Sequence, residues 1–221
     1  VTAAEVQGLL EYKGFLPAWR NSDYDFLLAY RKRLKKSAYY GFGIFAKYKA
    51  FKLIDGTLYP ILHPDPIRLS GLKGYEEQRS KVINNTKYLL SGKPAANVLL
   101  YGDAGTGKSS TVKGIFNEFK NMGLRLVEVA KKDLVAIPQL LDSLYCQPLK
   151  FIIFIDDLTI SKEQDELGTL KAILEGSVAG KPSNVVIYVT SNRRHLLQEN
   201  WSDRERDDIH RNETIQEELS L

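Results

Sequence analysis

One eight-residue segment constrains the fold of this chain more than any other feature. Residues 102–109 read Gly-Asp-Ala-Gly-Thr-Gly-Lys-Ser and match the phosphate-binding pattern G-x-x-x-x-G-K-[ST] at every fixed position. An apolar run, residues 97–101, precedes the segment, and residues 109–120 have the pattern of a helix. The sequence therefore predicts a strand, a tight loop and a helix in that order. A glycine-rich surface turn is the alternative interpretation, and this context argues against it.

Each residue type in the loop has a chemical reason. Glycines allow the backbone to curl so that several N–H groups face one phosphate, and the helix that follows adds its positive N-terminal end. We expect Lys108 to reach the β- and γ-phosphates of a nucleotide, and the Ser109 hydroxyl to bind Mg²⁺. The nucleotide-binding residues predicted from the loop are Gly102, Asp103, Ala104, Gly105, Thr106, Gly107, Lys108, Ser109 and Ser110.

Two later apolar runs also end in polar residues. Residues 151–155 lead into Asp156 and Asp157, and residues 185–189 lead towards Asn192. In an open α/β sheet, ligands bind beyond the carboxyl ends of the strands. We therefore expect Asp156 to hold Mg²⁺, Asp157 to orient or polarise the attacking water, and Asn192 to lie beside the γ-phosphate. Solvated aspartates at a turn and an asparagine at a helix start are the alternatives.

From residue 97 onward, the pattern alternates between strands and helices. Continuous apolar strands with intervening helices predict a parallel sheet covered on both faces. Pro138 is expected to divide one of the helices. The expected strands are residues 98–101, 124–129, 151–155 and 184–190, and the expected helices are residues 109–120, 132–145 and 165–177.

Residues 1–62 differ from the rest of the chain because they are rich in aromatic side chains. We predict a small, mostly helical unit here, with its aromatic side chains in a core rather than on a base-stacking surface. One helix is expected around residues 27–34, with its N-cap among residues 21–23. The basic run of residues 31–36 is interpreted as a solvated helix face, with a docking patch for nucleic acid or another partner as the alternative.

Prolines and glycines suggest where the domains meet. Residues 63–96 are expected to form a linker and then a helix over residues 76–90. Residues 97–200 form the predicted core, and residues 201–221 are a charged segment.

Composition limits the cellular setting. The net charge of +4 permits an acidic partner without requiring one. The single cysteine, Cys146, fits a reducing interior, and we expect it to be a small buried residue rather than a nucleophile. No apolar stretch approaches the ~18–20 residues that span a bilayer, and residues 1–10 lack the pattern of a signal peptide. These observations predict a cytoplasmic protein with no membrane partner.

Three motifs in this order resemble those of the AAA+ ATPases. Residues 102–109 resemble the Walker A motif, residues 151–157 the Walker B motif, and residues 190–192 the end of the sensor 1 strand. Residues 72–78 are similar to the segment that packs against adenine in this superfamily, so the resemblance implies base contacts from Leu72 and Tyr75. The sequence of these motifs most resembles that of a bacterial group of AAA+ ATPases of uncharacterised role. That closer match is carried by residues 101–110, 156–158, 170–176 and 190–196.

The resemblance implies a P-loop NTPase fold with a three-layer αβα core and a parallel sheet, preceded by a small helical extension. It also implies five core strands with the phosphate-loop strand at their centre. The cofactors would be ATP and Mg²⁺, the nucleotide partners ATP and ADP, and the assembly a homo-oligomeric ring. Such an ATPase would remodel or load an unknown protein or nucleic-acid client.

The chain departs from the superfamily in two respects. Asp156-Asp157 replaces the usual Asp-Glu, so a nucleotide-dependent switch with little turnover is the alternative function. No lid with a sensor 2 arginine is recognisable before Leu221, and we expect it to lie beyond that residue. Arg193 and Arg194 are candidates for a charged contact with nucleotide. A small-molecule kinase is a third hypothesis, but the sequence gives no reason to expect an acceptor site.

Overall fold

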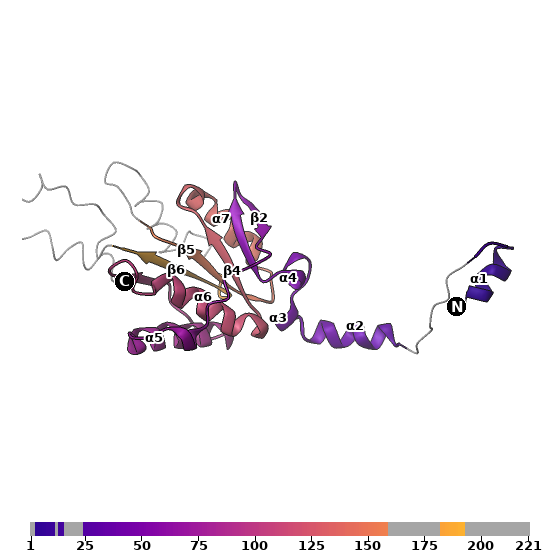
Figure 1. The fold of residues 1–221 in the computed structure, drawn as a ribbon, viewed down its shortest axis with the longest axis horizontal. Helices are drawn as coiled ribbons and strands as arrows, with labels where there is room; N and C mark the ends of the chain where they lie inside the picture. The colour runs from indigo at the N-terminus through magenta and orange to yellow at the C-terminus, as the bar shows by residue number, and fades with distance from the viewer. Residues whose placement is uncertain (1–2, 12, 16–23, 159–181, 193–221) are drawn as a thin grey trace, which may run out of the picture. The chain divides into compact units, whose positions relative to one another are not determined.

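The computed structural model describes residues 3–11, 13–15, 24–158 and 182–192. The chain divides into two compact units, Val1–Lys36 and Ser37–Leu221, and each is described by itself. None of the described helices is long and apolar enough to cross a bilayer. The first unit holds α1 (Ala3–Leu9) and α2 (Phe26–Lys35) (Figure 1). The helices of the second unit are α3 (Ser37–Tyr40), α4 (Ile44–Lys47), η1 (Leu69–Gly71), α5 (Glu76–Leu90), α6 (Lys108–Phe119), η2 (Lys120–Met122), η3 (Lys131–Ala136) and α7 (Ile137–Leu144).

The second unit is built on a six-stranded sheet with the order β2-β1-β4-β5-β6-β3. Every neighbouring pair is parallel except the hairpin of β1 and β2. The strand that leads into the phosphate-binding loop therefore pairs with β6, and β6 separates it from β5. The strands are β1 (Ala50–Ile54), β2 (Thr57–Pro60), β3 (Val98–Tyr101), β4 (Leu124–Val129), β5 (Lys150–Ile155) and β6 (Val185–Ser191).

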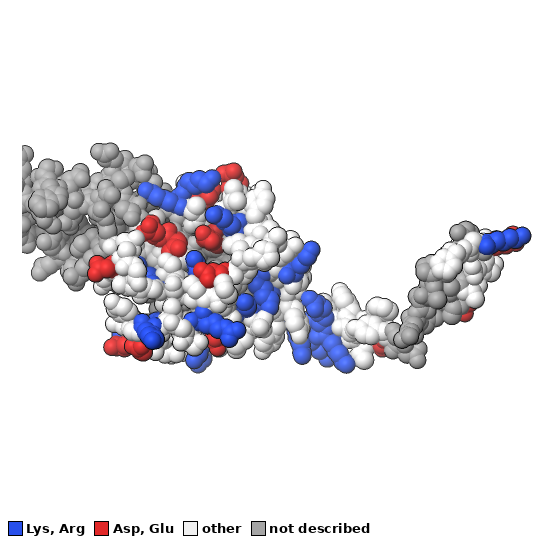
Figure 2. Space-filling model, viewed as in Figure 1, with Lys and Arg blue, Asp and Glu red and all other residues white. Residues whose placement is uncertain are grey.

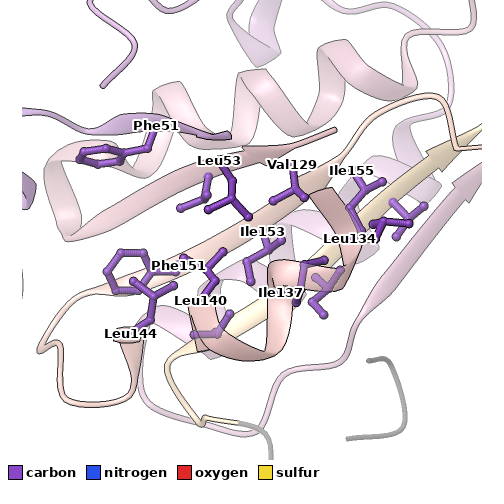
Figure 3. Close-up of a cluster of buried hydrophobic side chains, with 14 of the residues drawn as sticks. Phe51, Leu53, Val129, Leu134, Ile137, Leu140, Leu144, Phe151, Ile153 and Ile155 are labelled. Carbon is purple, nitrogen blue, oxygen red and sulfur yellow. The ribbon is translucent and has the colours of Figure 1, made fainter. Parts of the chain in front are cut away.

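Helices cover both faces of this sheet. On one face, Ile137, Leu140 and Leu144 of α7 pack against Phe151 and Ile153 of β5 (Figure 3). On the other face, side chains of α5 and α6 pack against the alternate residues of β5 and β6. This alternation fits strands that are buried on both sides. The three-layer α/β fold expected from the sequence is confirmed.

Most elements after residue 75 follow the sequence pattern. The structure reproduces the predicted helix Glu76–Leu90 and the strands Val98–Tyr101 and Leu124–Val129 residue for residue. Pro138 does divide the predicted helix, because η3 ends before it and α7 holds it in its first turn, where a missing N–H costs little. The predicted helix 165–177 lies outside the described residues.

The N-terminal part differs from the expectation in its extent. Residues 1–62 were expected to form one helical unit, but β1 and β2 belong to the central sheet, and the contact boundary falls after Lys36. Asp55 and Gly56 both have positive φ, which is the geometry of a two-residue type I′ hairpin turn. The described residues thus form a sheet of six strands where five core strands were expected, and among these strands β3 lies at the edge instead of the centre.

The aromatic side chains of this part are mostly exposed, so the expectation that they form a core is wrong for them. Phe45 and Phe51 are buried and stack edge-to-face at 5.0 Å between ring centroids. Eight others are exposed, namely Phe15, Tyr24, Phe26, Tyr30, Tyr39, Tyr40, Phe42 and Tyr59. Asp25 is the N-cap of α2, where its carboxylate accepts the N–H of Leu28. Cys146 is also exposed, contrary to expectation.

Candidate functional site

The phosphate-binding loop joins the end of β3 to the start of α6. Gly105 and Gly107 have φ of 78° and 81°, a left-handed conformation that side chains disfavour. Gly107 is the N-cap of α6 and makes no side-chain capping bond. The first N–H groups of a helix have no partners within it, so the start of this 12-residue helix is free to donate to an anion.

Lys108 lies over this loop. Its ammonium donates to the carbonyl oxygens of Gly102 and Asp103, both at 2.7 Å, and lies 3.4 Å from the Thr106 hydroxyl. A phosphate carries full negative charge and would compete with these neutral oxygens for the ammonium. Ala104 and Gly105, at the turn of the loop, are exposed. The loop therefore presents one cation and a helix start to the same space.

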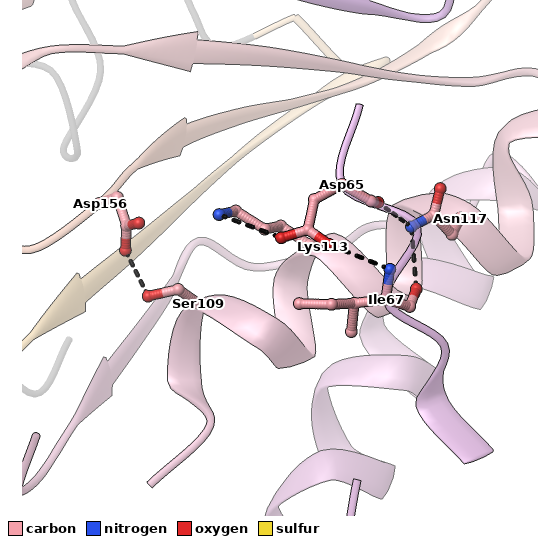
Figure 4. A network of polar contacts seen from close by, with 6 residues as sticks. All are labelled: Asp65, Ile67, Ser109, Lys113, Asn117 and Asp156. Atoms are coloured by element: carbon pink, nitrogen blue, oxygen red, sulfur yellow. Dashed lines mark hydrogen bonds and ion pairs between the residues drawn. The ribbon is translucent and has the colours of Figure 1, made fainter. Parts of the chain in front are cut away.

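A short polar network links the loop to β5 and β6. The Ser109 hydroxyl donates to Oδ1 of Asp156 at 2.5 Å (Figure 4). The Thr190 hydroxyl donates to the same oxygen at 2.6 Å and accepts the N–H of Asp157 at 2.8 Å. The start of α6 and the ends of β5 and β6, which are far apart in the sequence, thus meet at the Asp156 carboxylate.

A second contact joins the remaining predicted residues. The side-chain amide of Asn192 donates to Oδ1 of Asp157 at 2.5 Å. Asp157 has φ of 51°, an uncommon conformation for a residue with a side chain. Asp157 and Asn192 are both exposed, and Asp156 directly follows the last residue of β5. The structure therefore brings Lys108, Ser109 and all three strand-end residues to the carboxyl end of the sheet.

The oxygens at this end fit Mg²⁺. Two neighbouring oxygens in an octahedral Mg²⁺ shell lie about 2.9 Å apart, given Mg–O distances of about 2.0–2.1 Å. The Ser109 and Asp156 oxygens are 2.5 Å apart, so a small separation would let both bind one ion. The described residues contain no group of three or more acidic, histidine or cysteine side chains that could hold a metal alone. Water and phosphate oxygens would complete the shell, as is usual for Mg²⁺.

Thr190 lies in the segment that resembles the end of a sensor 1 strand, but its hydrogen bonds were not expected from the sequence. Its strand was recognised, but a threonine at a strand end reads as an ordinary β-branched strand residue. Its side chain is buried, and both of its hydrogen bonds go to the two predicted aspartates. A polar residue that follows five buried apolar ones in the same strand was the available signal.

The residues predicted to contact adenine lie between η1 and α5. Leu72 follows η1, and Tyr75 is the N-cap of α5 with φ of 55°. Within the described part of the chain, neither residue has a hydrogen bond to the loop at residues 102–109. Their role at the base stays a prediction.

The segment before α5 is fixed to the loop's own helix. Asn117 of α6 donates to the carbonyl oxygens of Asp65 and Ile67 at 2.7 and 2.8 Å (Figure 4). Lys113 of the same helix lies 3.9 Å from the Asp65 carboxylate. Leu69 of η1 contacts Gly114, where no side chain intervenes. These contacts hold the segment against α6.

Comparisons with solved structures find distant similarity. A chain in the E. coli MS115-1 HORMA:CdnC:Trip13 complex is 15% identical, with a TM-score of 0.46 and coverage of 62% of each chain. The C. elegans PCH-2 structure is 20% identical, with a TM-score of 0.47 and coverage of 66% of this chain and 45% of that one. The chain thus spans less than two thirds of the length of either structure. These similarities are too low to assign a function.

No curated protein matches the sequence significantly. One family model does match, over residues 46–221, which is most of the chain and includes β1, the loop and all the strand-end residues. The chain belongs to the family described as Protein of unknown function (DUF815).

Proposed function

We propose that this protein binds ATP with Mg²⁺ and hydrolyses it as an ATPase of the AAA+ type. The observation that carries the proposal is the contact between Ser109 and Asp156. It places a hydroxyl from the loop's helix and a carboxylate from β5 where one cation would meet both, beside a loop with the phosphate-binding pattern.

Each residue would have a separate task. The N–H groups at the start of α6 and the Lys108 ammonium would hold the phosphates, while Ser109 and Asp156 would hold Mg²⁺. Asp157 would orient the attacking water, and Asn192 would hold Asp157 and the γ-phosphate region through its amide. Mg²⁺ would neutralise the charge that develops on the phosphates.

The proposal extends to the protein's setting. ATP binding and hydrolysis would drive a homo-oligomeric ring to remodel or load a protein or nucleic-acid client in the cytoplasm. Leu72 and Tyr75 would contact the adenine base. The predicted charged contacts Arg193 and Arg194 lie outside the described residues.

A nucleotide-dependent switch with little turnover is the second candidate. The observation that favours it is the engagement of the Asp157 carboxylate by Asn192, with the Asp157 backbone in a left-handed conformation. An aspartate is one methylene shorter than the usual glutamate, so it would reach a water less easily.

Nucleotide affinity and phosphate release test both candidates. Binding of a fluorescent ATP analogue with Mg²⁺ should weaken at least tenfold in Lys108→Ala, because a hydrogen bond to a charged group contributes about 1.5–3 kcal/mol. Lys113→Ala is the matched control on the same helix, since its ammonium faces Asp65 and not the loop. Unchanged affinity in Lys108→Ala would show that the site is assigned wrongly.

Asp157→Asn then separates the two candidates. An ATPase should release phosphate as wild type and lose most of that release in the variant while still binding ATP. A wild-type protein that binds ATP tightly without releasing phosphate, alone or with added client, would favour the switch.

A further inference from the structure

A group of cations lies at the amino end of the sheet, opposite the nucleotide site. Lys49 precedes β1 and donates to the side-chain oxygen of Asn121. Lys120 donates to Oδ1 of Asn117 at 2.9 Å. Arg125 is buried at the start of β4 and donates only to backbone carbonyls. Within the described residues, these three cations have neutral acceptors and no ion pair.

The positive charges of this group repel one another. Burial lowers the pKa of Lys49, and the positive charges of Arg125 and Lys120 lower it further. Like charges held together without a counter-charge raise the local positive potential. An anion bound here would relieve that repulsion.

A cavity of about 380 Å³ opens at the same end. Its walls include Lys87 and Ser91 near the end of α5, Phe119 at the end of α6, and Lys150 at the start of β5. Tyr39 of α3 also lines it. The cavity therefore combines two more cations with aromatic and apolar walls.

Three exposed aromatic residues lie close together in the sequence at this end, and one of them, Tyr39, lines the cavity. Tyr39 is 54% exposed and Phe42 is 53% exposed, and Tyr40 between them is also exposed. Exposed aromatic rings that neighbour basic side chains offer flat stacking faces beside positive charge. Figure 2 shows uncharged and basic side chains side by side around α3 and α4.

We propose that the amino end of the sheet binds single-stranded nucleic acid. The basic aromatic surface comprises Lys49, Lys87, Lys120 and Lys150 for the phosphates and Tyr39, Tyr40 and Phe42 for the bases. Single strands offer both a polyanionic backbone and unstacked flat bases, which is the pairing of groups that this surface meets.

Other anionic partners fit less well. A duplex keeps its bases stacked, so the exposed rings would have no bases to stack on. A bilayer is flat on this scale, and lysines that line a cavity would be held away from its headgroups. This proposal goes beyond the proposed ATPase, because it requires no bound nucleotide.

Fluorescence anisotropy of a labelled oligothymidine tests the proposal with the full chain and no ATP. We expect a dissociation constant of about 10⁻⁴–10⁻⁶ M. The affinity should fall steeply as the salt concentration rises from about 50 to about 200 mM. Lys87→Gln with Lys120→Gln should reduce the slope of log affinity against log salt by about 1.4, since each lost phosphate contact contributes about 0.7 for single strands. Tyr39→Ala with Phe42→Ala should weaken binding at least fivefold with the slope unchanged.

Lys81→Gln is the matched control, because Lys81 lies on the same helix as Lys87 but pairs with Glu77 at 2.8 Å away from the cavity. Thermal unfolding identifies any variant that does not fold, and the exposed Lys87→Gln alone then serves as the substitute, with half the change in slope. The proposal fails if wild type does not bind the oligonucleotide at about 50 mM salt, or if the surface variants bind like wild type. It also fails if duplex or phosphatidylserine vesicles bind more tightly than the single strand.

Discussion

At the carboxyl end of the central sheet, polar side chains bond to one another, whereas at the amino end, three cations donate hydrogen bonds to neutral oxygens of the residues that the structure describes. Asp156 accepts two hydroxyls and Asp157 accepts an amide, so this end offers carboxylates to a cation. Lys49, Lys120 and Arg125 at the other end offer positive charge to an anion. A six-residue strand such as β5 spans about 20 Å, roughly twice the distance over which physiological salt screens charges. The two ends should therefore act independently.

The largest expected effect comes from removing the carboxylate at the centre of the carboxyl end. Asp156→Ala should reduce Mg²⁺-dependent phosphate release by about 100-fold or more, since it removes a preorganised charged group at the reacting phosphates. Binding of oligothymidine should be unchanged. Phosphate-release assays and anisotropy on the same preparation measure the two effects. If both activities fell together in a folded variant, the two ends would not be independent.

At the amino end, Arg125→Met should lower the free energy of unfolding by about 2–3 kcal/mol. The guanidinium donates to the carbonyls of Phe45 and Tyr40, and removing it leaves buried acceptors without donors. Burial lowers the pKa of Arg125 to about 10, which reflects the cost of burying its charge. Methionine removes that cost, so the loss of unfolding free energy should be smaller than the summed contributions of the hydrogen bonds of Arg125. Urea denaturation measures it.

Lys150→Met, at the start of the neighbouring strand β5, is the control for Arg125→Met. Lys150 is only partly buried and lines the cavity, so its loss should change stability far less. Equal stability in Arg125→Met and wild type would show that the segment of residues 40–45 is not held by this side chain.

The sequence predicted the carboxyl end far better than the amino end, for physical reasons. Strands buried on both faces read as continuous apolar runs, and parallel strands deliver their polar ends to one edge, so Ser109 and Asp156 could be placed together in advance. The hairpin of β1 and β2 was missed, although Asp55-Gly56 is a hairpin-turn signal, because aromatic residues on both sides suggested a helical core. Whether Tyr39 and Phe42 are exposed depends on which elements pack over them. The spacing of apolar residues in the sequence does not contain that information.

Thr190 sharpens the account of the carboxyl end with a moderate effect. Thr190→Val keeps the branched shape but removes the hydroxyl that bonds to Asp156 and to the N–H of Asp157. We expect phosphate release to fall about tenfold, equivalent to one lost hydrogen bond to a charged group, and the Mg²⁺ concentration for half activity to rise. Thr190→Ser restores the hydroxyl and should recover both values. Failure of serine to rescue would mean that Thr190 acts by packing alone.

Tyr188 tests whether the middle of β6 couples the two ends, and here the smallest effect is expected. Its buried hydroxyl bonds to Thr86 at 2.8 Å and to the Asn85 amide at 3.1 Å, so Tyr188→Phe should cost about 1 kcal/mol of unfolding free energy near neutral pH. Burial raises the pKa of Tyr188 above its ordinary value. The unfolded tyrosine ionises near pH 10 while the folded one stays neutral, so wild type loses stability as the pH rises above about 10, and the phenylalanine variant lacks that loss. The difference between the two in urea denaturation should therefore shrink above about pH 10, with ATP and oligothymidine binding unchanged at neutral pH. A change in either binding activity would show that β6 transmits between the two ends.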